Sequence, residues 1–330
     1  MQAYYFYRVL KNKNIKLIFK SVIGVCLFLW IAYSLYNQMQ HQKNLKSTLY
    51  NLYTEWNTEK ILLLVTVVLL MLVNWTIEAG KWRLLLKGTE EFSLLRSLQS
   101  VLTGVAVSVM TPNRIGEYMG RILYLKNVNK IQGVTVTIIG SFAQLIVTGF
   151  LGLLGLVYYI VFIKPSTWLN VLLLSSVLVC AGLIYFYFHL YKIIEWTNNI
   201  TFLKKIRVYL EIVRRFDQTQ LIRILLLSFL RYFIYTLQFT LLLRIMMVYA
   251  PLQEVIFTIW VIYWAMAVVP TIAVAEIGVR GGIAWFFLQP LTTNELGVVS
   301  SSLMLWLINL IIPALIGCLF VYKMKIYEDD

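Results

Sequence analysis

The sequence predicts an all-α polytopic membrane protein, with six full spans and two re-entrant or broken-helix hairpins arranged as an inverted-topology repeat. Of the 330 residues, 60% are hydrophobic and only 13% are charged, and the mean hydropathy is +0.76. Soluble domains carry roughly 25% charged residues. So much apolar surface cannot be hidden in one core, and lipid is the solvent that fits it.

The net charge of +14 is distributed along the chain in a way that also indicates a membrane. The Lys and Arg residues lie between the hydrophobic runs, as cytoplasmic loops do where they meet an anionic inner leaflet. A nucleic-acid partner is therefore not expected. We expect a bacterial-type inner (plasma) membrane location, with both termini in the cytoplasm.

The six predicted spans are the segments long enough to cross the hydrocarbon layer, which takes about 20 apolar residues. The first follows a basic N-terminus, but bulky residues follow it where a signal peptide would be cleaved, so we expect it to stay uncleaved. Glycines in the third span are expected to allow close helix packing. The segments are 16–36, 61–80, 134–163, 168–190, 224–248 and 298–322.

Two further apolar stretches, 97–110 and 255–269, are too short for a clean span and end near Pro112 and Pro270. Helix breakers at membrane depth are tolerated where the backbone is buried in protein or lines a cavity. We therefore predict a hairpin at each place. The second limbs would be 117–125 and 282–288.

The distribution of cations predicts how these elements are oriented. If both hairpins return to the side they entered from, every strongly basic segment lies in the cytoplasm, as the positive-inside rule requires. The chain is then one membrane domain, 1–330, with pseudo-repeat halves 15–163 and 168–323 of opposite orientation and a cytoplasmic amphipathic linker, 191–220. Inverted repeats of this kind are common in transporters, where one half rocks against the other.

The same short motif follows each proline and supports the repeat. Glu117 precedes Arg121 by four residues, and Glu276 precedes Arg280 by four residues. On a helix, residues at this spacing face each other, so each motif predicts an ion pair within its hairpin.

A charged side chain near the bilayer centre costs about 2.5 kcal/mol or more, so it usually faces the protein interior and marks function. Arg244 lies near a span end and is expected to snorkel. Gln144 and Asn309 are expected to bond between helices. The charged residues in or beside apolar segments are Glu78, Arg114, Glu117, Arg121, Arg231, Arg244, Glu276 and Arg280.

Two interpretations of these charges remain open. The pairs could neutralise themselves and pin their hairpins. Alternatively, the arginines could bind an anionic headgroup, because a guanidinium binds phosphate in a bidentate way and stays charged. The candidate substrate-binding residues are Asn74, Glu78, Arg114, Glu117, Arg121, Glu276 and Arg280.

The residues from Thr111 to Arg121 resemble the first motif of the lysylphosphatidylglycerol synthase transmembrane-region family, the flippase-like membrane portion of the bacterial multiple peptide resistance factors. Residues 74–83 are similar to the end of that family's second span, and residues 270–282 resemble its second motif. The resemblance implies translocation of a lipid or lipid-linked headgroup between leaflets. The soluble aminoacyl-transferase domain of those factors has no counterpart here, so lysyl-lipid synthesis is not expected.

The sequence therefore predicts a lipid flippase or transporter whose partner is a membrane lipid with an anionic headgroup. No catalytic residue, metal site or cofactor is expected, because the sequence contains no His/Cys/carboxylate cluster and no phosphate-binding loop. Two alternatives remain, namely a membrane-embedded transferase that acts on lipid-phosphate, and a non-transporting partner subunit. The sequence also leaves room for a homo-oligomer.

Overall fold

The computed structural model describes residues that all belong to the compact unit Glu55–Asp330. The described residues are mostly helical and include no strand, in agreement with the predicted all-α class. The predicted first span, 16–36, lies outside them, as does most of the predicted linker, 191–220. They are residues 57–109, 111, 115–126, 129–189, 211–269 and 276–326.

Five of the described helices are long and apolar enough to cross a membrane, and they coincide with the five predicted spans that follow the first. The second and the fifth of them include a π-helical turn, η2 (Tyr159–Ile163) and η5 (Leu307–Ile311). The five are α4 (Thr58–Leu86), α7 (Lys130–Tyr158) with η2, α8 (Thr167–Phe188), α11 (Gln218–Ile245), and α14 (Glu295–Trp306) continued through η5 into α15 (Ile312–Ile326).

Side-chain caps explain where four of these helices begin. An oxygen of the residue before the helix accepts a hydrogen bond from a backbone N–H of the first turn, which would otherwise lack a partner. The capping residues are Asn57, Asn129, Asp217 and Asn294, which begin α4, α7, α11 and α14.

Two pairs of shorter helices occupy the places of the predicted hairpins. The first pair is α5 (Leu94–Val109) and α6 (Gly116–Ile122), and the second is α12 (Leu252–Val268) and α13 (Glu276–Leu288). In the first pair, α6 packs back on α5 at the glycines Gly104 and Gly120. A Cβ on Gly120 would lie 2.5 Å from the Cα of Gly104, so only glycine allows this approach. In the second pair α13 begins at Glu276, earlier than the predicted limb 282–288.

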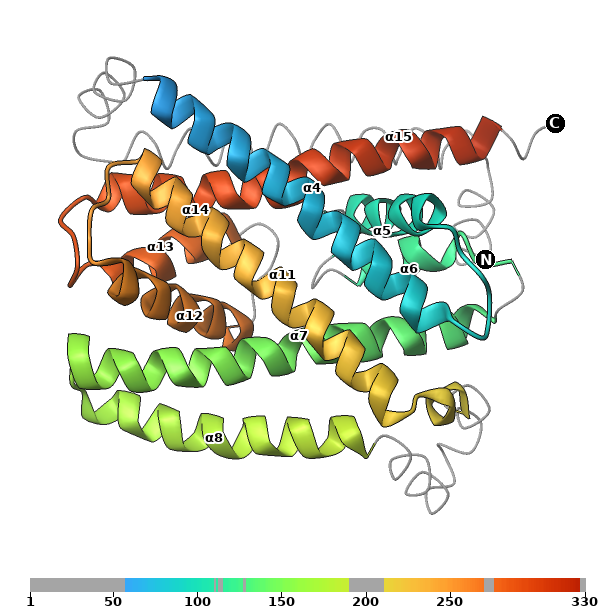
Figure 1. Ribbon diagram of the computed structural model, residues 1–330, viewed down its shortest axis with the longest axis horizontal. Helices are drawn as coiled ribbons and strands as arrows, with labels where there is room; N and C mark the ends of the chain where they lie inside the picture. Colours follow the sequence, from blue (N-terminus) through green and yellow to red (C-terminus); the bar gives the residue numbers. More distant parts are fainter. Residues whose placement is uncertain are drawn as a thin grey trace, which may run out of the picture. The chain divides into compact units, whose positions relative to one another are not determined.

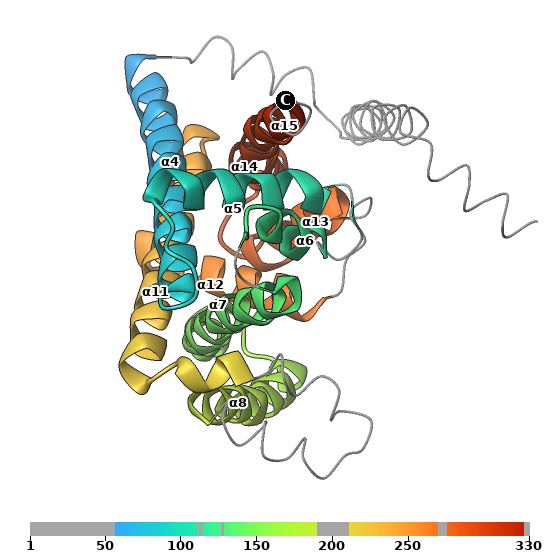
Figure 2. The same cartoon turned by 90° about the vertical axis from the view of Figure 1, so that its right-hand side faces the viewer.

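The helices α4 and α11 lie side by side and run in opposite directions, as Figure 1 and Figure 2 show. The start of α4 meets the end of α11, where Arg244 Nη2 lies 3.1 Å from Glu59 Oε1. Nearer the middle, the side-chain amide of Gln238 donates to the carbonyl of Val67 at 2.9 Å. Because an earlier residue of α4 contacts a later residue of α11 in this pair of contacts, the two helices pack antiparallel.

Glycines also join the two halves of the described chain. Gly152 in α7 packs against the Trp264 side chain of α12, and Gly155 packs against Trp260 one turn away. Gly317 in α15 packs against Leu102 and Ala106 of α5. The predicted role of the α7 glycines in close packing is therefore confirmed at two positions. The long closing helix of each half lies against the first hairpin helix of the other half.

Candidate functional site

Glu78 of α4 is the centre of a buried ion network. Its residue is only 3% exposed. Its carboxylate lies 2.7 Å from Lys81 Nζ and 2.7 Å from Arg121 Nη2, and it also forms an ion pair with Arg231 Nη1. Three basic side chains thus converge on one carboxylate from three helices, α4, α6 and α11.

Local structure explains how each basic group reaches Glu78. Lys81 lies one turn further along α4, and its ammonium group also approaches the carbonyl of Gly140 in α7, at 3.5 Å. Arg121 is brought in because α6 packs closely on α5, where the hydroxyl of Ser100 donates to the Arg121 carbonyl at 2.9 Å. Arg231 enters from α11, and its Nε donates to Asn74 Oδ1 at 2.9 Å.

Aromatic rings pack on two of the basic groups of this buried network, whose local dielectric constant is lower than that of water. The guanidinium carbon of Arg231 lies 5.6 Å from the ring centre of Trp75, and that of Arg121 lies 5.7 Å from the ring centre of Trp82. Both distances allow a cation–π attraction. The low dielectric constant strengthens the ion pairs, and it also makes any uncompensated charge costly.

Glu117 of α6 extends the network towards open space. Its carboxylate forms an ion pair with Arg121, as the four-residue spacing predicts, and its side chain is 29% exposed. Arg121 therefore lies between two carboxylates. Among the described side chains, this cluster of Glu78, Lys81, Glu117, Arg121 and Arg231 carries one more positive than negative charge.

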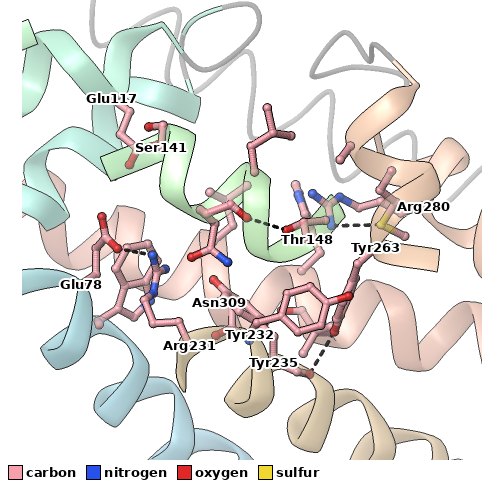
Figure 3. Close-up of a pocket in the computed structure, with 18 of the residues that line it drawn as sticks. Glu78, Glu117, Ser141, Thr148, Arg231, Tyr232, Tyr235, Tyr263, Arg280 and Asn309 are labelled. Carbon is pink, nitrogen blue, oxygen red and sulfur yellow. Dashed lines mark hydrogen bonds and ion pairs between the residues drawn. The ribbon is translucent and has the colours of Figure 1, made fainter. Parts of the chain in front are cut away.

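A cavity of about 570 Å³ opens beside the cluster and is lined by Glu78, Lys81, Glu117 and Arg231. Figure 3 shows Glu78 and Arg231 on one side of this cavity and Arg280 on the other, with Asn309 and Tyr232 between them. The walls come from both halves of the chain, namely from α4, α6 and α7 and from α11, α12, α13, α14 and η5.

The structure places most of the predicted site residues at this cavity. Glu78, Glu117 and Arg280 line it, while Asn74 and Arg121 contact lining residues. The Arg280 guanidinium lies on α13, with Nη1 3.9 Å from Met266 Sδ. Arg114 and the side chain of Glu276 are not among the described parts of the chain.

Lys81 and Arg231 are functional candidates that the predicted site omitted. The predicted second span, 61–80, ends one residue before Lys81, but α4 continues to Leu86 and Lys81 is 2% exposed. Its three-residue spacing from Glu78 was the available signal. Arg231 was recognised as a charge within a span, but nothing local in the sequence indicated that its partner would be Glu78.

Three polar residues outside the charge cluster, Arg244, Gln144 and Asn309, had predicted roles, and the structure shows their contacts. Arg244 is exposed at the end of α11 and pairs with Glu59. Gln144 donates to the Ser228 carbonyl of α11 at 3.5 Å. Asn309 was expected to bond between helices, but its amide donates to Leu305 within its own helix, at 3.1 Å. In the described part of the chain, no group of three His, Cys, Asp or Glu residues could hold a metal ion.

The sequence model of one known family, described as "Lysylphosphatidylglycerol synthase TM region", matches residues 17–317, which is most of the chain. No curated protein matches the chain. Together with the five apolar helices, the family match identifies a multi-pass membrane protein.

Proposed function

Because the chain belongs to the lysylphosphatidylglycerol synthase transmembrane-region family, whose description ties it to lipid handling, we propose that it is a lipid flippase. It moves an anionic phospholipid or lipid-linked headgroup across the inner membrane. The headgroup enters the cavity beside Glu78, and the acyl or prenyl tails stay in the surrounding lipid.

The excess positive charge of the buried cluster is the observation that carries this proposal. Lys81, Arg121 and Arg231 face only two carboxylates among the described side chains. An uncompensated charge inside a membrane protein is costly, so the site favours the binding of an anion that neutralises the excess positive charge. The guanidinium groups suit a phosphate because their planar donors bind two of its oxygens together.

The size and position of the cavity support the same proposal. Its volume of about 570 Å³ falls within the roughly 300–1,000 Å³ of small-ligand sites. The wall formed by α7 includes Ser141, which is exposed, and Leu145, which is 40% exposed. The cavity therefore opens beside the apolar outer face of α7, where a headgroup could enter sideways while its tails remain in lipid.

The order of elements supports an inverted repeat as the basis of transport. A long helix, two short helices and a closing long helix occur as α4 to α7 and again as α11 to α15. Gly152 packs on Trp264 of α12, and Gly317 packs in the corresponding way on Ala106 of α5. The antiparallel pairing of α4 with α11 is what an axis in the membrane plane would produce.

These contacts favour a motion other than the rocking of one sequence half against the other. The long helix that ends each half packs at its glycines against the hairpin of the other half, α7 against α12 and α15 against α5. We therefore propose that α5 and α6 move together with α15, and that α12 and α13 move together with α7. The cavity lies between these two groups and opens to one leaflet at a time.

The alternative of a non-transporting partner subunit predicts a fully packed space between the hairpins. The cavity runs against that alternative, because Glu117 of the first hairpin and Arg280 of the second both line it. The transferase alternative gains no supporting observation from the described residues.

The test is transfer of a fluorescent anionic phospholipid across the bilayer of reconstituted liposomes, measured by quenching from outside. Arg231→Gln removes one of the three central cations, and we expect transfer to fall about tenfold or more. Arg231→Lys keeps the charge and should fall between wild type and Arg231→Gln.

Arg244→Gln is the matched control, because it makes the same change in the same helix but at an exposed pair. It should transfer lipid at the wild-type rate. Wild-type transfer by a correctly folded Arg231→Gln protein would overturn the proposed site, and the absence of transfer by the wild-type protein would overturn the function.

A further inference from the structure

Arg121 belongs to the charge cluster around Glu78, but a carboxylate separates it from the cavity. Lys81 and Arg231 line the cavity, whereas Arg121 does not, and only 4% of the Arg121 side chain is exposed. Its partner Glu117 does line the cavity, as Figure 3 shows, and 29% of the Glu117 side chain is exposed. The carboxylate of Glu117 therefore lies between the Arg121 guanidinium and the open space.

The two carboxylates that flank Arg121 are held to different degrees. Both accept a hydrogen bond from the same atom, Arg121 Nη2. Glu78 also pairs with Lys81 and Arg231, and its side chain is 4% exposed. Among the described side chains, Glu117 pairs only with Arg121. Removing Glu78 from the cluster would leave three buried cations without their shared partner, whereas Glu117 needs only a rotation of its own side chain into the cavity.

An anion in the cavity must therefore compete with Glu117 for the donors of Arg121. A lipid phosphate and a carboxylate bind a guanidinium in the same way, through oxygens placed against its planar N–H groups. We propose that Glu117 is an internal substitute for the anionic headgroup. It holds Arg121 while the cavity is empty and turns away when the headgroup takes its place.

This inference rests on the proposed function and deepens it, because it names the group that regulates binding and release at that site. The displaced carboxylate stays tethered to α6, one helical turn from Arg121. Like charges held side by side in a binding site repel each other strongly, so the bound anion is held less tightly than the cations alone would hold it. The return of Glu117 to Arg121 then speeds the release of the headgroup.

Binding of a short-chain anionic lipid tests the competition directly. Glu117→Gln keeps the size of the side chain and removes its charge. The probe is dioctanoyl phosphatidic acid, titrated into the purified full chain in detergent and followed by calorimetry. We expect the variant to bind it about tenfold more tightly or better, because the repulsion is gone. A carboxylate that only positioned Arg121 for the lipid would give the opposite result, since its loss would weaken binding.

A second variant and a matched control accompany this measurement. Glu117→Asp keeps the charge but is too short to hold Arg121 as closely, so its affinity should lie between those of wild type and Glu117→Gln. Glu59→Gln is the control, because it makes the same change at an exposed carboxylate that also pairs with an arginine. Its affinity should equal that of wild type. Thermal unfolding checks that each variant is folded.

Transfer of fluorescent phosphatidic acid in reconstituted liposomes supplies the second readout. At saturating lipid we expect Glu117→Gln to transfer it about tenfold more slowly, because tighter binding slows dissociation. Equal or weaker binding by folded Glu117 variants would overturn the inference, and so would tighter binding combined with wild-type transfer. Tighter binding by Glu117→Gln in a chain whose wild type transfers no lipid would support the competition and overturn the flippase proposal.

Discussion

The two hairpins of the described chain differ in how they are held. The first, α5 and α6, is fixed by charge in the half of the hairpin away from its tip. In the last turn of α6, Arg121 pairs with Glu78 of α4. At its base Arg96 Nη2 lies 2.7 Å from Glu90 Oε1 and donates to the Tyr124 carbonyl at 2.5 Å, and Glu90 Oε2 accepts from the N–H of Lys126 at 3.0 Å.

Tyrosine hydroxyls join the second hairpin, α12 and α13, to its neighbours. The hydroxyl of Tyr263 in α12 donates to the Tyr235 carbonyl of α11 at 2.9 Å. The hydroxyl of Tyr159 in η2 donates to the Phe287 carbonyl of α13 at 3.2 Å.

The long helices that precede the two hairpins also differ. Counted from the start of its helix, Gln238 of α11 occupies the place that Glu78 occupies in α4, and its amide bonds to α4 at Val67. A buried carboxylate in α4 thus has a neutral amide as its counterpart in α11.

The largest expected effect comes from removing the centre of the charged anchor. Glu78→Gln leaves three buried basic groups without their shared carboxylate, and we expect a loss of about 3–5 kcal/mol in the free energy of unfolding. Gln238→Leu, at the corresponding place in α11, removes one hydrogen bond and should cost about 1 kcal/mol. Denaturant unfolding in detergent measures both. Equal losses would show that the carboxylate in α4 and the amide at the same place in α11 contribute equally.

A smaller effect is expected at the bases of the hairpins. Glu90→Gln weakens charge-assisted hydrogen bonds to Arg96 and to the backbone of Lys126, and should cost about 1.5–3 kcal/mol. Asn294→Ala removes a helix cap and should cost about 1 kcal/mol. Hydrogen exchange should show faster opening of α6 in the first variant and of the start of α14 in the second. Faster opening of both helices in either variant would contradict separate anchoring.

The smallest effect is expected at the surface contact between α4 and α11. Arg244→Gln breaks an exposed ion pair with Glu59, and exposed pairs contribute about 0–1 kcal/mol. Salt titration should abolish even that difference, because exposed charges are screened. A loss comparable to that of Glu78→Gln would mean that the surface contact, and not the buried network, joins the two helices.

The sequence predicted the helices well because their signals are local. Five spans follow from apolar length, and the short hairpin helices follow from breakers such as Pro112. The pair of Glu117 with Arg121 follows from four-residue spacing and is present in the structure.

The site was predicted less completely, for two physical reasons. The second span was predicted to end at Gly80 because the apolar run ends there. The helix continues because Lys81 has a buried partner, Glu78, inside the protein. The meeting of Glu78 with Arg231 depends on the packing of α4 on α11, and residues so far apart in sequence carry no local sign of contact. The π-helical turn that presents Asn309 likewise has no simple sequence pattern.

The packing of Gly317 on Leu102 and Ala106 has a consequence for biosynthesis. A ribosome makes α5 long before α15, so the first hairpin reaches the membrane before the helix that covers it exists. Its glycine contact can form only after α15 has been made. A nascent chain stopped short of residue 317 would therefore lose the packing of its first hairpin as well as α15.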